Sequence, residues 1–175
     1  MIRIFIIGFM GAGKTTLGKA LARATGLSFV DLDWYIEERM HRSISQLFAE
    51  RGEAGFRELE RNMLHEASQF ENVIISTGGG APCFFDNMDY MNRHGRTVFL
   101  DVSPEVLFTR LRIARHQRPL LQQKNDDELR AFIASALTER GATYSSAQLR
   151  FVADRLESRP QIKEAVELLR EQLQL

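Results

Sequence analysis

The stretch MIRIFIIGFMGAGKTTLGKAL (residues 1–21) determines the fold that this sequence predicts. Its apolar run from Ile2 to Ile7 is rich in β-branched residues and ends at a glycine, which is typical of a buried strand in a parallel sheet. Apolar residues then recur at helical spacing as far as Gly26, a residue suited to end a helix. The chain is therefore expected to open with a strand, a glycine-rich turn and a helix.

The turn between this strand and helix matches a phosphate-binding motif. Gly8, four residues and then Gly13-Lys14-Thr15 fit the pattern G-x-x-x-x-G-K-[ST]. Its glycines let successive N–H groups point at an anion, and the helix behind adds its positive end. Lys14 is expected to reach the β- and γ-phosphates of a nucleotide, and the Thr15 hydroxyl to ligate Mg²⁺. A chance glycine-rich turn is the alternative, but the position between a strand and a helix favours the phosphate site.

Length and composition indicate a single globular domain and argue against several classes of partner. The chain has 175 residues, 44% of them hydrophobic, which suits one domain over 1–175 with its own core. Lys+Arg and Asp+Glu are balanced at 23 each, so no broad basic field favours nucleic acid or an anionic membrane as a partner. No apolar run approaches the ~18 residues of a membrane helix. The single cysteine, Cys83, excludes an internal disulfide and fits a cytoplasmic protein. A monomer is the default expectation.

Two acidic residues follow the second predicted strand. The segment Ser28–Asp33 looks like a strand, and alternation would put Asp31 and Asp33 on the same side at its carboxyl end, where α/β sheets bind ligands. One carboxylate could hold Mg²⁺ through water and the other could accept a proton from a substrate hydroxyl. The alternative is that an aspartate here only caps a helix that begins at Trp34.

The middle of the chain offers one candidate arginine and one glycine cluster. Ser43 and Gln46 form a capping box for a helix that Gly52 and Gly55 are expected to interrupt, and a longer helix follows. Arg57 lies on its charged face, where solvation alone is the alternative role. A third strand (73–76) leads into three glycines that would let a ligand approach the backbone and bind to its N–H groups, although a flexible turn is the alternative. These are Gly78, Gly79 and Gly80.

Two further arginine positions follow a fourth predicted strand (98–102). A helix starting at Ser103-Pro104 runs into four arginines within residues 110–118, which suggests a mobile flap over phosphates or simply an exposed helix end. Asp126 or Asp127 is expected to cap the next helix. Its apolar stripe continues onto Arg140, which is costly unless the cation meets an anion, and a structural salt bridge is the alternative to a ligand. A fifth strand (149–153) and an amphipathic helix complete a doubly wound, five-stranded parallel α/β sheet flanked by helices.

Taken together, these motifs resemble those of the shikimate kinase family over essentially the whole chain. The phosphate loop alone is shared by many nucleotide enzymes, but its combination with the other motifs in this order is far more specific. The matching segments are GFMGAGKTT (8–16), Asp-Leu-Asp (31–33), GEAGFRELE (52–60), TGGGA (77–81), Arg-Pro-Leu-Leu (118–121) and Arg140. After Arg140 the chain reads Gly-Ala-Thr-Tyr, where the family often has a Pro-Leu-Tyr-like run.

The resemblance implies a P-loop kinase that phosphorylates the 3-hydroxyl of shikimate with ATP and Mg²⁺, a step towards chorismate and the aromatic amino acids. It implies that Lys14, Asp33 and Arg118 are catalytic, with Arg118 on a lid of about 112–124. Thr15 would ligate Mg²⁺, with Asp31 helping through water. The expected ATP contacts are Gly11, Ala12, Gly13, Lys14, Thr15, Thr16, Arg112, Arg118 and Arg159.

On the acceptor side, the resemblance implies a substrate region of about 33–61. Asp33 would bind the hydroxyls and act as general base, and Arg57, Gly79 and Arg140 would hold the carboxylate beside a wall formed by Gly78 and Gly80. Two rival hypotheses are another small-metabolite kinase of this fold, for gluconate or nucleoside monophosphates, and a catalytically silent nucleotide-binding module. A GTPase switch is disfavoured because no Asn-Lys-x-Asp motif occurs.

Overall fold

The computed structural model describes residues 1–175 and confirms the doubly wound α/β fold with five parallel strands. The strand order is β2-β3-β1-β4-β5. Residues 4–7 of the central strand are fully buried between helices on both faces, which explains why the run is apolar without alternation. The strands are β1 (Arg3–Ile7), β2 (Ser28–Asp31), β3 (Val73–Ser76), β4 (Arg96–Asp101) and β5 (Leu149–Val152).

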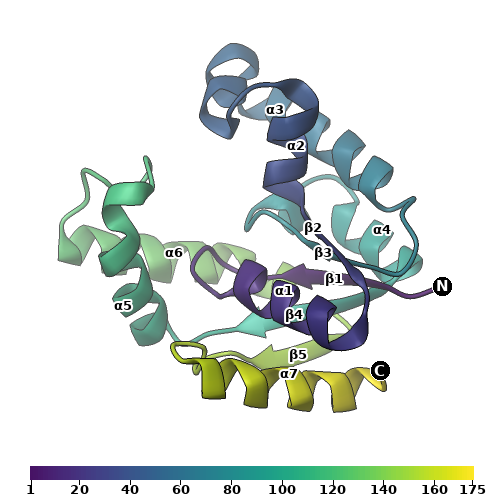
Figure 1. Cartoon of the computed structure of the whole chain (residues 1–175). Helices are drawn as coiled ribbons and strands as arrows, with labels where there is room; N and C mark the ends of the chain where they lie inside the picture. The colour runs from purple at the N-terminus through teal and green to yellow at the C-terminus, as the bar shows by residue number, and fades with distance from the viewer.

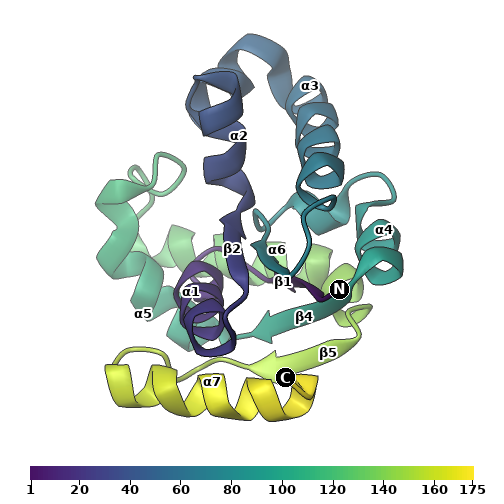
Figure 2. The same ribbon diagram turned by 45° about the vertical axis from the view of Figure 1, so that its right-hand side comes forward.

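Seven α-helices surround this sheet (Figure 1). Helices α1 and α7 pack together on one face, and α4 and α6 lie on the other (Figure 2). Helices α2 and α3 rise beyond the carboxyl edge of the sheet on one side, and α5 lies on the opposite side (Figure 1). The helices are α1 (Lys14–Thr25), α2 (Leu32–Met40), α3 (Ile44–Ala67), α4 (Asn87–His94), α5 (Pro104–Ala114), α6 (Asp126–Ser145) and α7 (Arg159–Leu173). Two 3₁₀ turns, η1 (Ala81–Cys83) and η2 (Arg115–Gln117), complete the fold.

The strand order defines where a ligand is expected. The chain leaves β1 through α1 to β2 at one edge, and later returns to β4 on the other side of β1. A doubly wound sheet binds ligands in the crevice at this reversal, outside the carboxyl ends of its strands. The turns after β1, β2 and β3 all lie there, and they carry the predicted phosphate loop, acidic pair and glycine cluster.

The second strand is shorter than the sequence predicted. It ends at Asp31, whose carboxylate accepts hydrogen bonds from the backbone N–H groups of Asp33 (3.1 Å) and Trp34 (3.4 Å). Because this cap starts α2 immediately, Asp33 belongs to the first turn of a helix and not to the strand. The expected strand alternation of the two aspartates was therefore wrong, although both lie at the carboxyl edge of the sheet.

Other helix boundaries show where local patterns succeed and fail. The capping box of Ser43 and Gln46 is confirmed, and Gly52 breaks α3 with a φ of 67°, but Gly55 stays helical. Asn125, not either following aspartate, caps α6 by accepting from the N–H of Glu128 at 2.8 Å. Helix α4 was not predicted.

One hydrophobic cluster of 40 buried residues joins the sheet to the helices on both faces. It includes all of residues 4–7 from β1, together with Leu17 and Leu21 of α1 and Leu169 and Leu173 of α7. None of the helices combines the length and hydrophobicity needed to cross a lipid bilayer. The core therefore fixes the strand ends that carry the candidate site.

Candidate active site

A cleft of about 430 Å³ opens at the carboxyl edge of the sheet, where the strand order reverses. Its walls come from the phosphate loop, the ends of β2 and β3, helix α5 with the segment after it, and the loop before α7. The lining residues are Met10, Gly11, Gly13, Lys14, Thr15, Thr16, Asp31, Asp33, Ser76, Thr77, Gly78, Gly79, Arg110, Leu111, Ala114, Arg118, Leu156 and Glu157. Most of the residues predicted from the sequence are thus brought together.

The phosphate loop has the backbone that its glycines allow. Gly11 and Gly13 have φ values of 78° and 94°, in the left-handed region that other residues adopt only with strain. Gly13 is the N-cap of α1, so the free N–H groups at the start of this helix face the cleft. Ala12 is buried behind the loop. This arrangement is suited to bind a phosphate chain.

Lys14 places a buried ammonium group at the base of the loop. Its Nζ donates to the backbone carbonyls of Gly8 (2.7 Å) and Phe9 (3.0 Å). Burial lowers the pKa of Lys14 to about 8, although the nearby Asp33 opposes this shift. The amine is therefore still largely protonated at pH 7 and provides a cation within the cleft.

Thr15 and Asp31 form a pair of hard oxygen donors. The Thr15 hydroxyl donates to Asp31 Oδ2 at 2.7 Å, while the other oxygen of Asp31 caps α2. Hydroxyl and carboxylate oxygens are ligands that Mg²⁺ prefers, and this ion usually keeps waters and substrate phosphates as its remaining ligands. The two residues present therefore fit a magnesium ion beside the phosphate loop.

Asp33 lines the cleft between Lys14 and Gly78. Burial raises the pKa of Asp33, and the neighbouring Asp31 raises it further, while Lys14 lowers it. A carboxylate with a raised pKa takes up a proton more readily, which is the property required of a general base.

Two arginines and a fully buried acid, Glu60, lie near the partly buried Asp33. Arg57 Nη1 is 2.8 Å from Glu60 Oε1, and its guanidinium lies 4.1 Å from the centre of the Phe84 ring. The Arg140 guanidinium lies 5.6 Å from the centre of the Phe9 ring. Glu60 is only 1% exposed, and burial raises its pKa to about 6 although Arg57 opposes the shift.

The glycine cluster packs directly against these charged groups. A Cβ atom added to Gly80 would lie 2.6 Å from Arg57 Nη2, and one added to Gly79 would lie 3.3 Å from Arg140 Nη1. A Cβ atom on Gly78 would lie 3.0 Å from Asp33 Oδ1. The structure therefore brings the predicted acid, both predicted arginines and the three glycines into one wall beside the cleft, although Arg57, Gly80 and Arg140 do not line the cleft itself.

Arg118 lies in the turn that follows η2 and lines the cleft. It also lines an adjoining hollow of about 690 Å³ between α2, α3 and residues 117–120. Met10 and Asp33 also line both spaces, so the two hollows adjoin at these residues. This position suits an arginine that moves towards a bound anion.

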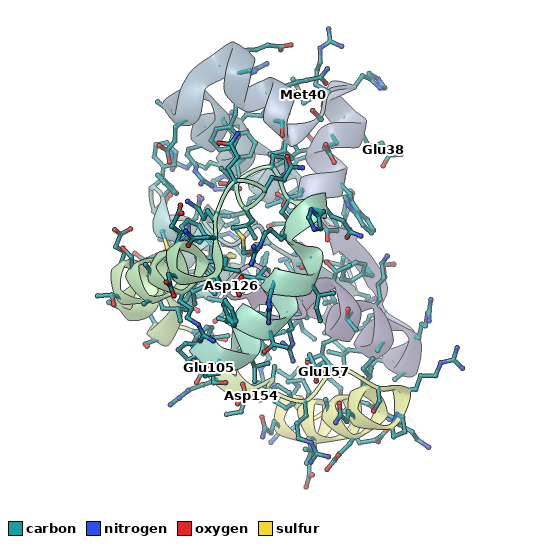
Figure 3. All side chains as sticks on the ribbon, turned by 90° about the vertical axis from the view of Figure 1, so that its left-hand side faces the viewer. Glu38, Met40, Glu105, Asp126, Asp154 and Glu157 are labelled. Atoms are coloured by element: carbon teal, nitrogen blue, oxygen red, sulfur yellow. The ribbon has the colours of Figure 1, made fainter.

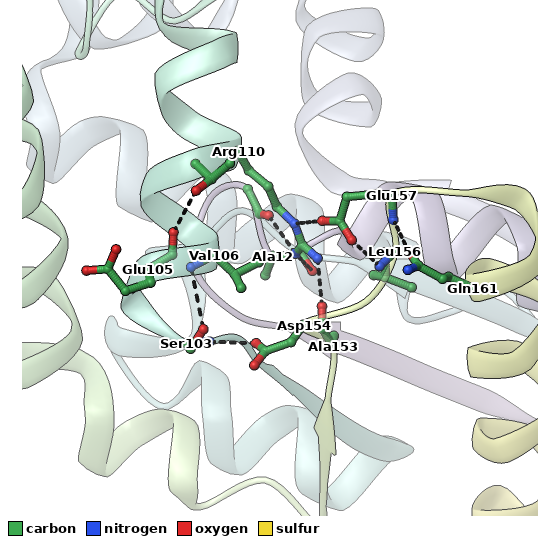
Figure 4. Close-up of polar contacts among 12 residues, drawn as sticks. Ala12, Ser103, Glu105, Val106, Arg110, Ala153, Asp154, Leu156, Glu157 and Gln161 are labelled. Atoms are coloured by element: carbon green, nitrogen blue, oxygen red, sulfur yellow. Dashed lines mark hydrogen bonds and ion pairs between the residues drawn. The ribbon is translucent and has the colours of Figure 1, made fainter.

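Two other predicted arginines lie outside the cleft, and a different one lines it. Arg112 pairs with Asp126 at 3.4 Å with its side chain 61% exposed, on the side of the molecule shown in Figure 3. Arg159 is exposed at the start of α7. Arg110 instead donates to the carbonyls of Gly11 (3.2 Å), Ala12 (3.3 Å) and Ala153 (2.9 Å) and pairs with Glu157 at 2.7 Å (Figure 4).

The family model described as shikimate kinase matches residues 10–172 of the chain, which includes nearly all of this site. The chain belongs to the shikimate kinase family. A curated shikimate kinase from Bacteroides thetaiotaomicron is 65% identical over 175 residues, covering 100% of both chains.

Solved shikimate kinase structures show the same fold. The crystal structure of the enzyme from Bacteroides thetaiotaomicron superposes with a TM-score of 0.97 at 65% identity and covers 99% of both chains. The Acinetobacter baumannii enzyme, solved in complex with shikimate, superposes with a TM-score of 0.85 at 30% identity and covers 99% of this chain and 94% of its own.

Within this shikimate kinase fold, the sequence interpretation missed several residues of the site. Glu60 stands in the Phe-Arg-x-x-Glu motif, so its i,i+3 spacing from Arg57 was an available signal for the ion pair. Arg110 was visible only as one of four clustered arginines. Leu156 and Glu157 lie in the loop before α7 (residues 154–160), a segment in which the resemblance pointed to Arg159 alone.

Proposed function

We propose that this chain transfers the γ-phosphate of ATP to the 3-hydroxyl of shikimate, giving ADP and shikimate 3-phosphate. The observation that carries the proposal is the single wall in which Gly78–Gly80 pack against Asp33, Arg57 and Arg140, beside a phosphate loop. Two guanidinium groups suit the carboxylate of a small ring acid, and an aspartate suits its hydroxyls. The family membership supports the same acceptor.

On the acceptor side, Arg57 and Arg140 would bind the carboxylate of shikimate, with the N–H groups of the glycine cluster as additional donors. Glu60 would hold Arg57 in place through its 2.8 Å contact, because a fixed guanidinium loses less entropy when it binds. The substrate region of about 33–61 predicted from the sequence would then extend to the glycine cluster and Arg140.

On the phosphate side, the N–H groups of residues 11–16 would cradle ATP and Lys14 would bind the transferred phosphate. Thr15 and Asp31 would hold Mg²⁺, which when bound neutralises charge on the β- and γ-phosphates. Arg118 would approach the same phosphates when the lid over about 112–124 closes, which also excludes water that would hydrolyse ATP.

Asp33 would accept the proton of the reacting hydroxyl. As the hydroxyl oxygen bonds to the γ-phosphorus, the bond between that phosphorus and the β–γ bridging oxygen breaks and ADP leaves. The proton passes to the Asp33 carboxylate, whose raised pKa favours that transfer. Positioning and charge neutralisation supply the rest of the rate enhancement.

For the adenine end of ATP, we infer that the base packs on Arg110, which lines the cleft, and not on Arg112. Its guanidinium edges are bonded to the phosphate loop, to Ala153 and to Glu157, which leaves the planar face for a base to stack on. The loop at residues 154–160 contributes Leu156 and Glu157 to this end of the cleft. Arg159 would have no direct contact.

A panel of acceptors tests this function. Purified protein is given ATP, Mg²⁺ and, in turn, shikimate, gluconate or nucleoside monophosphates, and the release of ADP is measured. We expect turnover with shikimate alone, and a Lys14→Met variant prepared in the same way shows whether a contaminating kinase is responsible. Turnover only with another acceptor contradicts the proposal, and ATP binding without transfer to any acceptor indicates a silent module.

The same proposal includes a single-domain cytoplasmic monomer that needs no nucleic acid or membrane partner. The site is built entirely from one chain, and the charge is balanced at 23 basic and 23 acidic residues. Light scattering after size-exclusion chromatography measures the mass directly, and we expect the mass of one chain, 20.1 kDa.

A further inference from the structure

Tyr144 of α6 is fully buried and its hydroxyl is bonded to the glycine cluster. The hydroxyl donates to the backbone carbonyl of Gly79 at 2.6 Å. Its ring stacks on Phe99 of β4 with 5.1 Å between ring centres and an angle of 25°. A phenylalanine would fill this core position as well, and a buried hydroxyl is unfavourable without a partner. The hydroxyl is therefore present for its contact with Gly79.

The carbonyl of Gly79 has no other donor. Each of the three glycine carbonyls accepts one hydrogen bond, but two of them are satisfied by backbone turns: Gly78 from the N–H of Ala81 (3.2 Å) and Gly80 from the N–H of Cys83 (3.0 Å). Only Gly79 depends on a side chain. Glycine has the greatest backbone freedom of all residues. Without the Tyr144 hydroxyl, Gly79 would therefore be the glycine of the cluster whose backbone conformation is least restrained.

Fixing the Gly79 carbonyl also fixes the N–H of Gly80, since both belong to one planar peptide unit and point in opposite directions. This peptide lies between the two arginines of the acceptor wall. The Cβ position of Gly79 is 3.3 Å from Arg140, and that of Gly80 is 2.6 Å from Arg57. A tilt of the peptide would therefore change the gap between the two guanidinium groups.

Helix α6 presents Tyr144 and Arg140 to the same glycine. The two residues are four positions apart, so they lie on one face of the helix, and both approach Gly79. The guanidinium of Arg140 is close enough to influence the titration of the tyrosine hydroxyl, whose pKa burial raises to about 12. The hydroxyl is thus a neutral donor throughout the physiological pH range.

We propose that Tyr144 is a positioning residue for the acceptor site, which fixes the peptide between Gly79 and Gly80 against Arg57 and Arg140 through the Gly79 carbonyl. The inference rests on the proposed function, because it assumes that this wall binds the acceptor. Tyr144 forms no hydrogen bond to the phosphate loop, although the Cβ position of Gly79 lies 3.4 Å from the backbone of Gly8 and of Met10. The effect of the hydroxyl should therefore be mainly on the acceptor.

The test is Tyr144→Phe, which removes only the hydroxyl. We expect the KM and the Kd for shikimate to rise about tenfold, the effect of losing about one hydrogen bond, and the KM for ATP to change less than twofold. Tyr90→Phe is the matched control, because Tyr90 is also nearly buried but its hydroxyl makes no hydrogen bond within the chain and lies outside the cleft. It should leave both constants unchanged.

A general loss of folded protein would lower kcat without separating the two substrates, so the split between the KM values identifies a positioning role. Replacing Tyr144 with 4-aminophenylalanine supplies an N–H donor at the same place, so the KM for shikimate should return most of the way to the wild-type value. The same variant provides the test if Tyr144→Phe does not fold. An unchanged shikimate KM in folded Tyr144→Phe, an equal rise for both substrates, or no restoration by the amine overturns the inference.

The two proposals fail in different ways. Wild-type protein that does not phosphorylate shikimate contradicts the proposed function. The role of Tyr144 is then judged from the ratio of the acceptor KM in Tyr144→Phe to that in the wild type, for whichever acceptor is turned over. A ratio of one with that acceptor overturns the role of Tyr144 in this wall.

Discussion

Asp33 lies in the first turn of α2, close to Lys14 on one side and to Gly78 on the other. This position between Lys14 and Gly78 is the reason why we propose Asp33 as the carboxylate that contacts the reacting hydroxyl. Asp31, two residues earlier, is bonded to Thr15 and to the start of the helix and is not free for that task.

Asp33→Asn should lower kcat by on the order of a hundredfold or more, because the amide cannot take up the proton of the hydroxyl. The KM for ATP should change little. Steady-state kinetics with both substrates measure the effect, and Asp127→Asn, an exposed aspartate in the first turn of α6, is the matched control. A variant with nearly normal kcat would leave Asp33 a binding residue only.

Glu60 gives a prediction about stability and pH. Its pKa in the folded protein is about 6, above the ordinary value of 4.5, so the folded state binds its proton more tightly than the unfolded state. Its contribution to the free energy of unfolding is therefore complete below pH 4.5 and is lost as the pH rises through 6. The total change corresponds to about 2 kcal/mol.

Glu60→Gln removes this titration, so the free energy of unfolding of the wild type should fall relative to the variant between pH 4.5 and 6. Urea unfolding at several pH values measures the difference between the two proteins. A difference that stays constant over this range would contradict the assigned pKa.

At the scale of elements, the sequence predicted the features that depend on residues close together in the chain, and it did not predict those that depend on how the helices pack. The phosphate loop and α1 follow from consecutive residues, and the capping box of α3 from a pair three residues apart. Arg110 and Arg112 differ by about half a turn on α5, so which one faces the cleft depends on how that helix packs, and no local pattern shows this. Helix α4 has only eight residues, too few to display a clear period.

The acidic pair after β2 illustrates a partly correct prediction. Asp31 and Asp33 were placed at the carboxyl edge because parallel strands end there, and this holds whether or not the strand continues. The strand pattern could not show that the side chain of Asp31 would cap α2, since Asp is compatible with both roles. The position in the fold was therefore predictable and the local conformation was not.

Two glycines of different conformation give an element-scale prediction. Gly52 has a φ of 67°, so Gly52→Ala should destabilise the protein by about 1 kcal/mol through backbone strain alone, because its Cβ position is open. Gly141 is helical within α6 and equally open, so Gly141→Ala should stabilise by about 0.5–1 kcal/mol. Thermal unfolding of both variants measures opposite shifts of Tm, and shifts of the same sign would contradict this account.

At the scale of the whole molecule, the cleft lies between two groups of helices on opposite sides of the sheet's carboxyl edge. Helices α2 and α3 rise on one side and α5 with the lid segment on the other (Figure 1). Trp34 and Leu120 face the hollow of about 690 Å³ between them and are 54% and 71% exposed. If residues 112–124 close over the cleft as proposed, these apolar side chains would approach each other and leave water.

Trp34 is the only tryptophan, so its fluorescence would report the proposed closure. Adding shikimate with a non-hydrolysable ATP analogue and Mg²⁺ should shift the emission to shorter wavelength and reduce quenching by acrylamide, because the indole becomes less exposed. Leu120→Ser should weaken the shift while leaving the spectrum of the free protein unchanged. Emission that is the same with and without the ligands would show that the lid does not reach α2.

The side chain of Asp31 has a consequence for how this enzyme can evolve. One oxygen of its carboxylate faces the threonine that would hold the metal, and the other ties down the turn that carries Asp33. A mutation that reshapes this turn to admit a different hydroxy acid would therefore also disturb Asp31 and Thr15, the residues proposed to hold Mg²⁺. New acceptor preferences should arise more readily from changes on α6 or beside the glycines, where neither oxygen is involved.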